Sequence, residues 1–168
     1  MARRCDPRVF LVVAFSVAAL SGCGKSEPVA PAGSGGHGHA HTPKYGGVLV
    51  EVGQHEFSLE VLVDPSSGKL TVWTLDAHAE AYVRIPARTL EAMAKAGAGP
   101  EQGITLKPVA NPATGEVEGS TAQFEATADW LKGAQEVEGS VKLVTFGTKT
   151  FNDIKFDWPH GAKSGQGH

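Results

Sequence analysis

The stretch that decides the fold is residues 55–75, HEFSLEVLVDPSSGKLTVWTL. Its first arm alternates apolar and polar residues with a period of two, which is typical of a strand with one face against a core. The run DPSSG at 64–68 is a turn signal, and residues 69–75 supply a second arm. The stretch therefore predicts an antiparallel hairpin. Its inner face carries Phe57, Leu59, Val61 and Val63, and its other face carries Glu56, Ser58 and Glu60.

Shorter runs of the same kind lie on both sides of this hairpin. One precedes it at 47–52, and three follow it at 121–128, 140–146 and 150–158. Short strands separated by turns predict an all-β domain, a small antiparallel β-sandwich, with a partly open barrel as the alternative. Residues 90–96, LEAMAKA, are the exception because Glu, Ala, Met and Lys favour helix, so we expect a short helix or loop near 87–96.

The amino-terminal residues have the pattern of a secretory signal. Three arginines in residues 1–8 precede an apolar run of twelve residues at 9–20. As a helix this run is roughly 18 Å long, too short for a hydrocarbon core of about 30 Å. It ends in Leu20-Ser21-Gly22-Cys23, which resembles the bacterial lipobox. The resemblance implies that the Cys23 thiol receives diacylglycerol and that the chain is then cleaved before Cys23, which becomes the amino terminus and carries acyl chains such as palmitate. Gly24 at the next position implies an outer-membrane anchor that faces the periplasm.

The chain then divides into four predicted segments. Residues 1–22 are a lipoprotein signal peptide, and 23–43 are a flexible tether that contains histidines. A β domain occupies 44–159, and a disordered tail occupies 160–168. The tether is rich in Gly, Pro, Ala, Ser and His, so it buries too little apolar surface to offset the entropy of ordering.

Charge and cysteine content exclude several classes of function. The chain carries 15 basic and 18 acidic residues. Without the three arginines and one aspartate of 1–22 the net charge is −5, which argues against a nucleic-acid partner. Of the two cysteines, Cys5 lies in the signal and Cys23 is the lipid site, so no disulfide is expected. The chain has no HExxH, P-loop, dinucleotide or serine-hydrolase motif, and we expect no enzyme activity.

Histidines are the chief candidates for chemistry. His37, His39 and His41 form H-G-H-A-H in the tether, and imidazole is a good ligand for Cu and Zn. His55 and His78 flank the predicted hairpin at its open end, where the tether also arrives. His41, His55 and His78 would then form a three-histidine site, with Asp76 or Glu80 beside it. The alternatives are a solvated linker and unrelated histidines at the ends of strands.

The run His39-Ala40-His41-Thr42-Pro43-Lys44-Tyr45-Gly46-Gly47-Val48-Leu49 resembles a module of small exported bacterial proteins, in which a histidine-containing tether leads into P-x-x-G-G-x-aliphatic. Such modules accompany periplasmic adaptor subunits of heavy-metal efflux systems. Tyr45 stands where many relatives have histidine.

The resemblance implies a β-rich periplasmic module linked to metal handling. Together with the lipobox and the histidines, it leads us to expect a membrane-anchored periplasmic lipoprotein that binds Cu or Zn weakly or assists metal handling. Its partners would be the membrane, through the lipid anchor, and envelope or metal-efflux proteins. The alternative function is a non-catalytic interaction or structural lipoprotein of the envelope that binds no metal.

Overall fold

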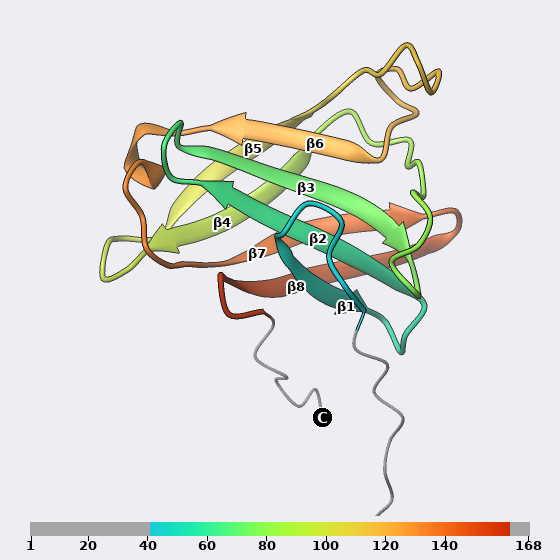
Figure 1. Ribbon diagram of the computed structural model, residues 1–168. Helices are drawn as coiled ribbons and strands as arrows, with labels where there is room; N and C mark the ends of the chain where they lie inside the picture. Colours follow the sequence, from blue (N-terminus) through green and yellow to red (C-terminus); the bar gives the residue numbers. More distant parts are fainter. Residues whose placement is uncertain (1–40, 162–168) are drawn as a thin grey trace, which may run out of the picture. The chain divides into compact units, whose positions relative to one another are not determined.

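The computed structural model describes residues 41–161. Within them the chain forms eight strands of one antiparallel sheet and a single short 3₁₀ helix, η1 (Asp129–Leu131) (Figure 1). The order across the sheet is β1-β2-β3-β6-β5-β4-β7-β8. The strands are β1 (Val48–Val52), β2 (Phe57–Asp64), β3 (Lys69–Asp76), β4 (Leu90–Ala96), β5 (Gln102–Pro108), β6 (Gln123–Thr127), β7 (Val137–Phe146) and β8 (Lys149–Trp158).

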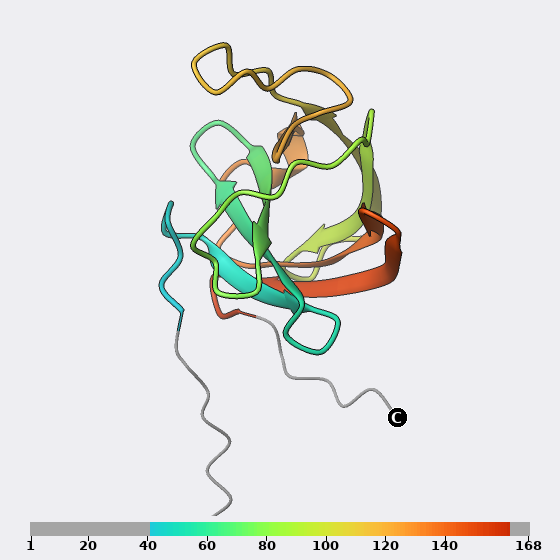
Figure 2. The same cartoon turned by 90° about the vertical axis from the view of Figure 1, so that its right-hand side faces the viewer.

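The sheet curls until its two end strands, β1 and β8, contact each other, which gives a nearly closed barrel (Figure 2). The all-β prediction is confirmed, and the partly open barrel is the architecture that forms. The sandwich is not formed, because β5 pairs with β6 as well as with β4 and so joins the two halves into one sheet. Curling removes most of the unpaired sheet edge, which a sandwich would leave open.

The hairpin predicted at 55–75 is confirmed. β2 and β3 pair from Phe57↔Asp76 to Asp64↔Lys69, and alternate residues of both strands enter the core. Asp64 holds the turn: its carboxylate accepts the Ser66 and Ser67 hydroxyls at 2.6 and 2.5 Å. These bonds, the one from Ser66 foremost, lower the pKa of Asp64 to about 2.

The expectation of a helix or loop near 87–96 is wrong, because residues 90–96 form strand β4. Leu90, Ala92 and Ala94 are buried on one face, which is a period of two rather than 3.6. β5 and β7 pair with β4 on either side and supply the hydrogen bonds that a helix would make internally. Non-local pairing therefore overrides the local helix propensity of this segment.

Strand β5 was not predicted. Its signal was present, because Ile104 and Leu106 alternate with exposed residues and are buried in the core. Gln102 and Gly103 at its start weaken the pattern. Within 41–161 no helix is long and apolar enough to cross a membrane. The predicted signal peptide, Cys23, most of the tether and residues 162–168 of the tail lie outside the described residues.

Candidate functional site

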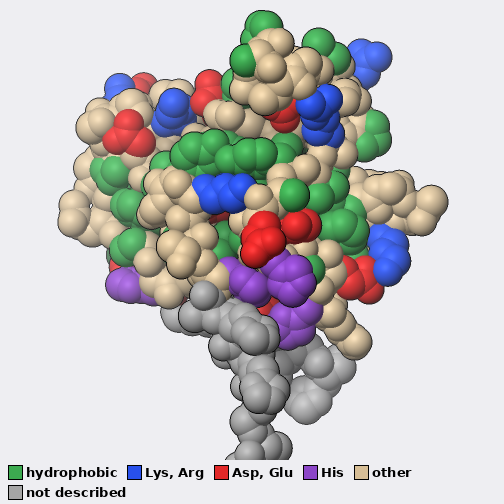
Figure 3. Space-filling view, turned by 45° about the vertical axis from the view of Figure 1, so that its right-hand side comes forward, with side chains coloured by type: hydrophobic (Ala, Val, Ile, Leu, Met, Phe, Trp, Pro, Cys, Tyr) green, Lys and Arg blue, Asp and Glu red, His purple; other side chains and the backbone are tan. Residues whose placement is uncertain are grey.

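Two of the predicted metal ligands, His41 and His78, lie in contact. Their ring centroids are 5.5 Å apart with an interplanar angle of 63°. His41 precedes β1, and His78 lies in the turn that follows β3. Figure 3 shows histidine and acidic side chains gathered at this end of the domain. Two imidazoles that are 37 positions apart in the sequence thus lie together in the fold.

The turn that carries His78 is ordered by Asp76. The Asp76 carboxylate accepts the backbone N–H of Glu80 at 2.8 Å, and the Asp76 carbonyl accepts the N–H of Ala79 at 3.1 Å. Partial burial raises the pKa of Asp76, but hydrogen bonds from the backbone of Ala81 and Glu80 and the charge of His78 outweigh it, so the net shift is downward. An ionised carboxylate therefore lies beside the His78 ring.

Residues 44–47, which we call the strap, lead from His41 into β1 and are held by Glu60. The Glu60 side chain is 0 % exposed although it lies on the outer face of β2, because the strap covers it. Its carboxylate accepts three backbone N–H groups, from Lys44 at 2.8 Å, Tyr45 at 2.7 Å and Gly47 at 3.1 Å. Hydrogen bonds to a charged acceptor are the stronger kind, so the path of the strap is well defined.

Aromatic contacts hold the strap from its other side. Tyr45 stacks on Trp73 of β3, with centroids 4.1 Å apart and an interplanar angle of 15°. The hydroxyls of Tyr45 and Tyr82 are 2.7 Å apart, and burial followed by this bond raises the pKa of Tyr82. The Lys44 ammonium donates to the Glu80 carbonyl and lies 4.6 Å from the Tyr82 ring centroid. The strap is thus joined to the turn that carries His78.

The backbone geometry of the strap explains why residues 46 and 47 are both glycine. Gly46 has a φ of +76°, which glycine adopts without steric cost. A Cβ on Gly47 would lie 2.6 Å from the Val61 carbonyl oxygen, so only glycine lets the strap approach β2 this closely. The two glycines of the P-x-x-G-G motif therefore allow the strap to lie over Glu60. The alternating pattern of β2 gave no sign of this role.

We predicted that His55 would lie with His41 and His78 in one site, but the structure gives His55 a different partner. The register Phe57↔Asp76 does place the turns of His55 and His78 at the same end of β2 and β3. The Nδ1 atom of His55, however, lies 3.2 Å from the Glu51 carboxylate, and both side chains are exposed. Among residues 41–161, no group of three or more His, Cys, Asp or Glu residues is placed to hold a metal ion. His37 and His39 lie outside the described residues.

The spacing of the His41–His78 pair fits two ligands of one ion. An imidazole nitrogen lies about 1.1 Å from its ring centre and a Zn–N bond is about 2.1 Å, so two rings on one tetrahedral zinc have centroids roughly 5.2 Å apart. The observed 5.5 Å is close to this value. Two imidazoles alone make a weak site, so further ligands are needed for tight binding.

The comparisons with known proteins add no family assignment. No family model, no curated protein and no solved structure matches this chain.

Proposed function

We propose that this protein is an exported lipoprotein, anchored through Cys23, that binds a transition-metal ion such as Cu(II) or Zn(II) and assists metal handling in the cell envelope. The observation that carries the proposal is the 5.5 Å contact between His41 and His78. His41 is also the last histidine of H-G-H-A-H, so the tract reaches the folded domain at the second imidazole.

The surroundings of the pair favour a cation. Asp76 lies next to His78 and stays ionised, and the Glu60 carboxylate holds the strap two residues beyond Pro43. A preorganised pair of ligands lowers the entropy that a metal must offset when it orders the rest of the site. His37 and His39 precede His41 in the sequence and would supply the third and fourth ligands. Four imidazole nitrogens would then complete the coordination of Cu or Zn.

Calorimetry with Cu(II) and Zn(II) on residues 24–168 tests the proposal. We expect one ion per chain, with an affinity that falls at least about tenfold, roughly 1.4 kcal/mol, in the His78→Ala variant. The matched control is His55→Ala, which removes an exposed histidine from the same end of the barrel. This control is expected to bind the ion within about twofold of the parent chain.

The outcome also separates the two candidate ligand groups. A His37→Ala, His39→Ala double variant should weaken binding without abolishing it, because His41 and His78 remain. Absence of binding at micromolar metal would remove the proposal. Equal affinities of the His78→Ala and His55→Ala variants would place the metal on the tract alone.

A further inference from the structure

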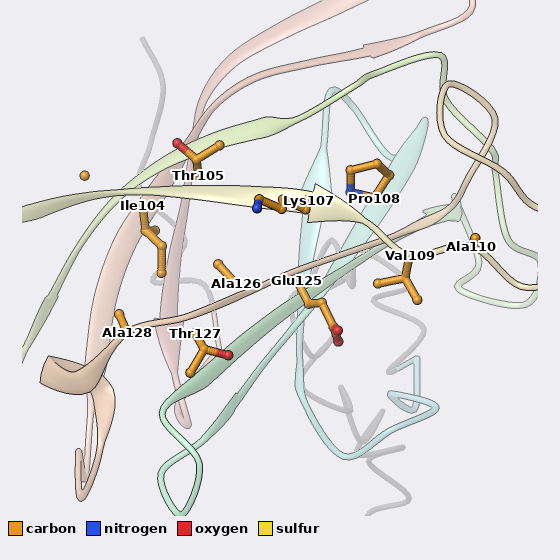
Figure 4. Close-up of a pocket in the computed structure, with 11 residues that line it drawn as sticks. Ile104, Thr105, Lys107, Pro108, Val109, Ala110, Glu125, Ala126, Thr127 and Ala128 are labelled. Atoms are coloured by element: carbon orange, nitrogen blue, oxygen red, sulfur yellow. The ribbon is translucent and has the colours of Figure 1, made fainter.

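The sheet is incompletely paired between β5 and β6. Within the described residues the ladder between these strands has two pairs, Lys107↔Glu125 and Pro108↔Phe124. Before Lys107, β5 continues to pair with β4 on its other side, and beyond Glu125, β6 continues to pair with β3. The strands diverge from a closed end and leave a wedge, which we call the β5–β6 gap (Figure 4).

The walls of the gap carry main-chain hydrogen-bonding groups. In an antiparallel strand, the N–H and C=O groups of alternate residues point to opposite edges. The edges of 102–106 in β5 and of 126–127 in β6 that face the gap have no strand partner in the described sheet. Such edges recognise the backbone of an extended polypeptide, which is the chemistry of strand addition.

The size of the gap matches one short strand. Its cavity has a volume of about 730 Å³. The cavity opens to solvent and has room for a short extended segment. The length of that segment follows from the stretch of β5 without a partner on this side, 102–106, which is five residues.

The side chains around the gap set a pattern for the occupant. Ile104 is buried in the core and Thr105 is exposed, and Figure 4 shows that the two point to opposite sides of β5. On β6, Ala126 packs against the core and Thr127 is exposed. A strand between them meets Ile104 and the small Ala126 on its inner side and two threonines on its outer side. It must therefore alternate aliphatic and polar residues.

The charges favour an acidic residue at the closed end. Lys107 is exposed there, and within 41–161 no carboxylate forms an ion pair with it. Glu125 across from it is already paired with Lys69 at 3.5 Å. β5 runs toward the closed end. An acidic residue at the end of the peptide that enters the closed end can pair with Lys107. We assign this residue to the carboxyl end, so that the peptide runs parallel to β5 and antiparallel to β6.

The undescribed segments of the mature chain, as the proposed cleavage before Cys23 defines it, do not have the pattern of such a strand. The stretch 24–40 of this chain contains Pro28 and Pro31 and is rich in glycine, and residues 162–168, AKSGQGH, contain no β-branched residue. Proline donates no main-chain hydrogen bond, and glycine disfavours strands. We propose that the β5–β6 gap binds an extended segment of a partner protein, about five residues long with alternating aliphatic and polar residues and an acidic carboxyl end, by adding it to the sheet.

Synthetic peptides and amide hydrogen exchange on residues 24–168 test this proposal. The probe is Thr-Val-Thr-Val-Glu, and its control is Thr-Pro-Thr-Pro-Glu, which lacks two N–H donors but keeps the charge. The probe should bind at least tenfold more tightly than the control. It should also slow exchange at the amides that face the gap, those of Gly103, Thr105 and Thr127, because Val109 donates to the Gln123 carbonyl and odd-numbered residues of both strands face this side. The β4–β7 ladder should be unchanged. Equal binding of both peptides, or no change in exchange, overturns the proposal.

A charge exchange tests the orientation. Thr-Val-Thr-Val-Lys should bind less tightly than the probe, and Lys107→Glu should reverse this preference. The matched control, Lys155→Glu on β8, should leave it unchanged. If neither variant alters the preference, the assigned direction is wrong. If the gap amides are already protected in 24–168 without peptide, a segment of this chain fills the gap and the proposal of a separate partner fails.

Discussion

Removal of the Glu60 carboxylate is the sharpest test of how the strap is held. Glu60→Ala deletes the acceptor of three backbone N–H groups, those of Lys44, Tyr45 and Gly47. Each such bond contributes about 1 kcal/mol, net of the water that the released N–H groups regain at the surface. For the three bonds together we expect a loss of about 2–4 kcal/mol in the free energy of unfolding.

Guanidinium unfolding of residues 24–168 measures this loss, and thermal melting of the same protein checks it. At about 4 °C per kcal/mol for a domain of this size, the midpoint temperature should fall by roughly 8–16 °C. The matched control is Glu56→Ala, which removes a partly exposed carboxylate 2.6 Å from the exposed Lys149 ammonium. Exposed pairs contribute little, so the control should lose less than about 1 kcal/mol.

Hydrogen exchange separates a local effect from a general one. In Glu60→Ala the amides of Tyr45 and Gly47 should exchange much faster than in the parent chain, while those of the β7–β8 ladder change only with global stability. The reasoning is refuted if Glu60→Ala and Glu56→Ala lose the same stability, or if the two strap amides remain protected.

Three further changes have expected outcomes. Asp64→Ala removes a carboxylate whose folded-state pKa, about 2, lies below its ordinary value of 3.8; the stability that it contributes should be constant above about pH 5 and vanish as pH falls through 2, as seen by urea unfolding against pH. Gly47→Ala places a Cβ 2.6 Å from a carbonyl oxygen and should cost about 1–3 kcal/mol, whereas Gly103→Ala, with its nearest neighbour at 3.6 Å, should cost less in the same melting assay. Cys23→Ser should abolish incorporation of labelled palmitate and release the protein from membranes; retention of the label would contradict the lipobox prediction.

The parts of the fold that were predicted are those with local signals. Alternation in β2 and the Asp64 turn lie within one stretch of chain, so the β2–β3 hairpin could be predicted from the residues, whereas its register is known from the structure. Strand β4 could not, because Ala92 and Ala94 favour helix until β5 and β7 pair with them. Whether a sheet closes on itself depends on contacts such as β1 with β8, which no local pattern encodes.

The same distinction between local and non-local signals applies to the candidate site. The approach of His41 to His78 followed from the expected hairpin and the point where the tether arrives. The burial of Glu60 did not, because a strap sixteen residues earlier in the chain covers it. The separate contact of His55 with Glu51 depends on a turn in which His55 has a φ of +57°, an unusual conformation that composition does not indicate.

The most direct test of metal binding is a zinc titration of residues 24–168 followed through the imidazole nitrogen signals of each histidine. Since His41 and His78 are the two imidazoles already in contact, we predict that one equivalent of Zn(II) shifts both sets of signals together, whereas those of His55 stay in place. Signals of His41 and His78 that do not move, or that move no more than those of His55, would contradict the account.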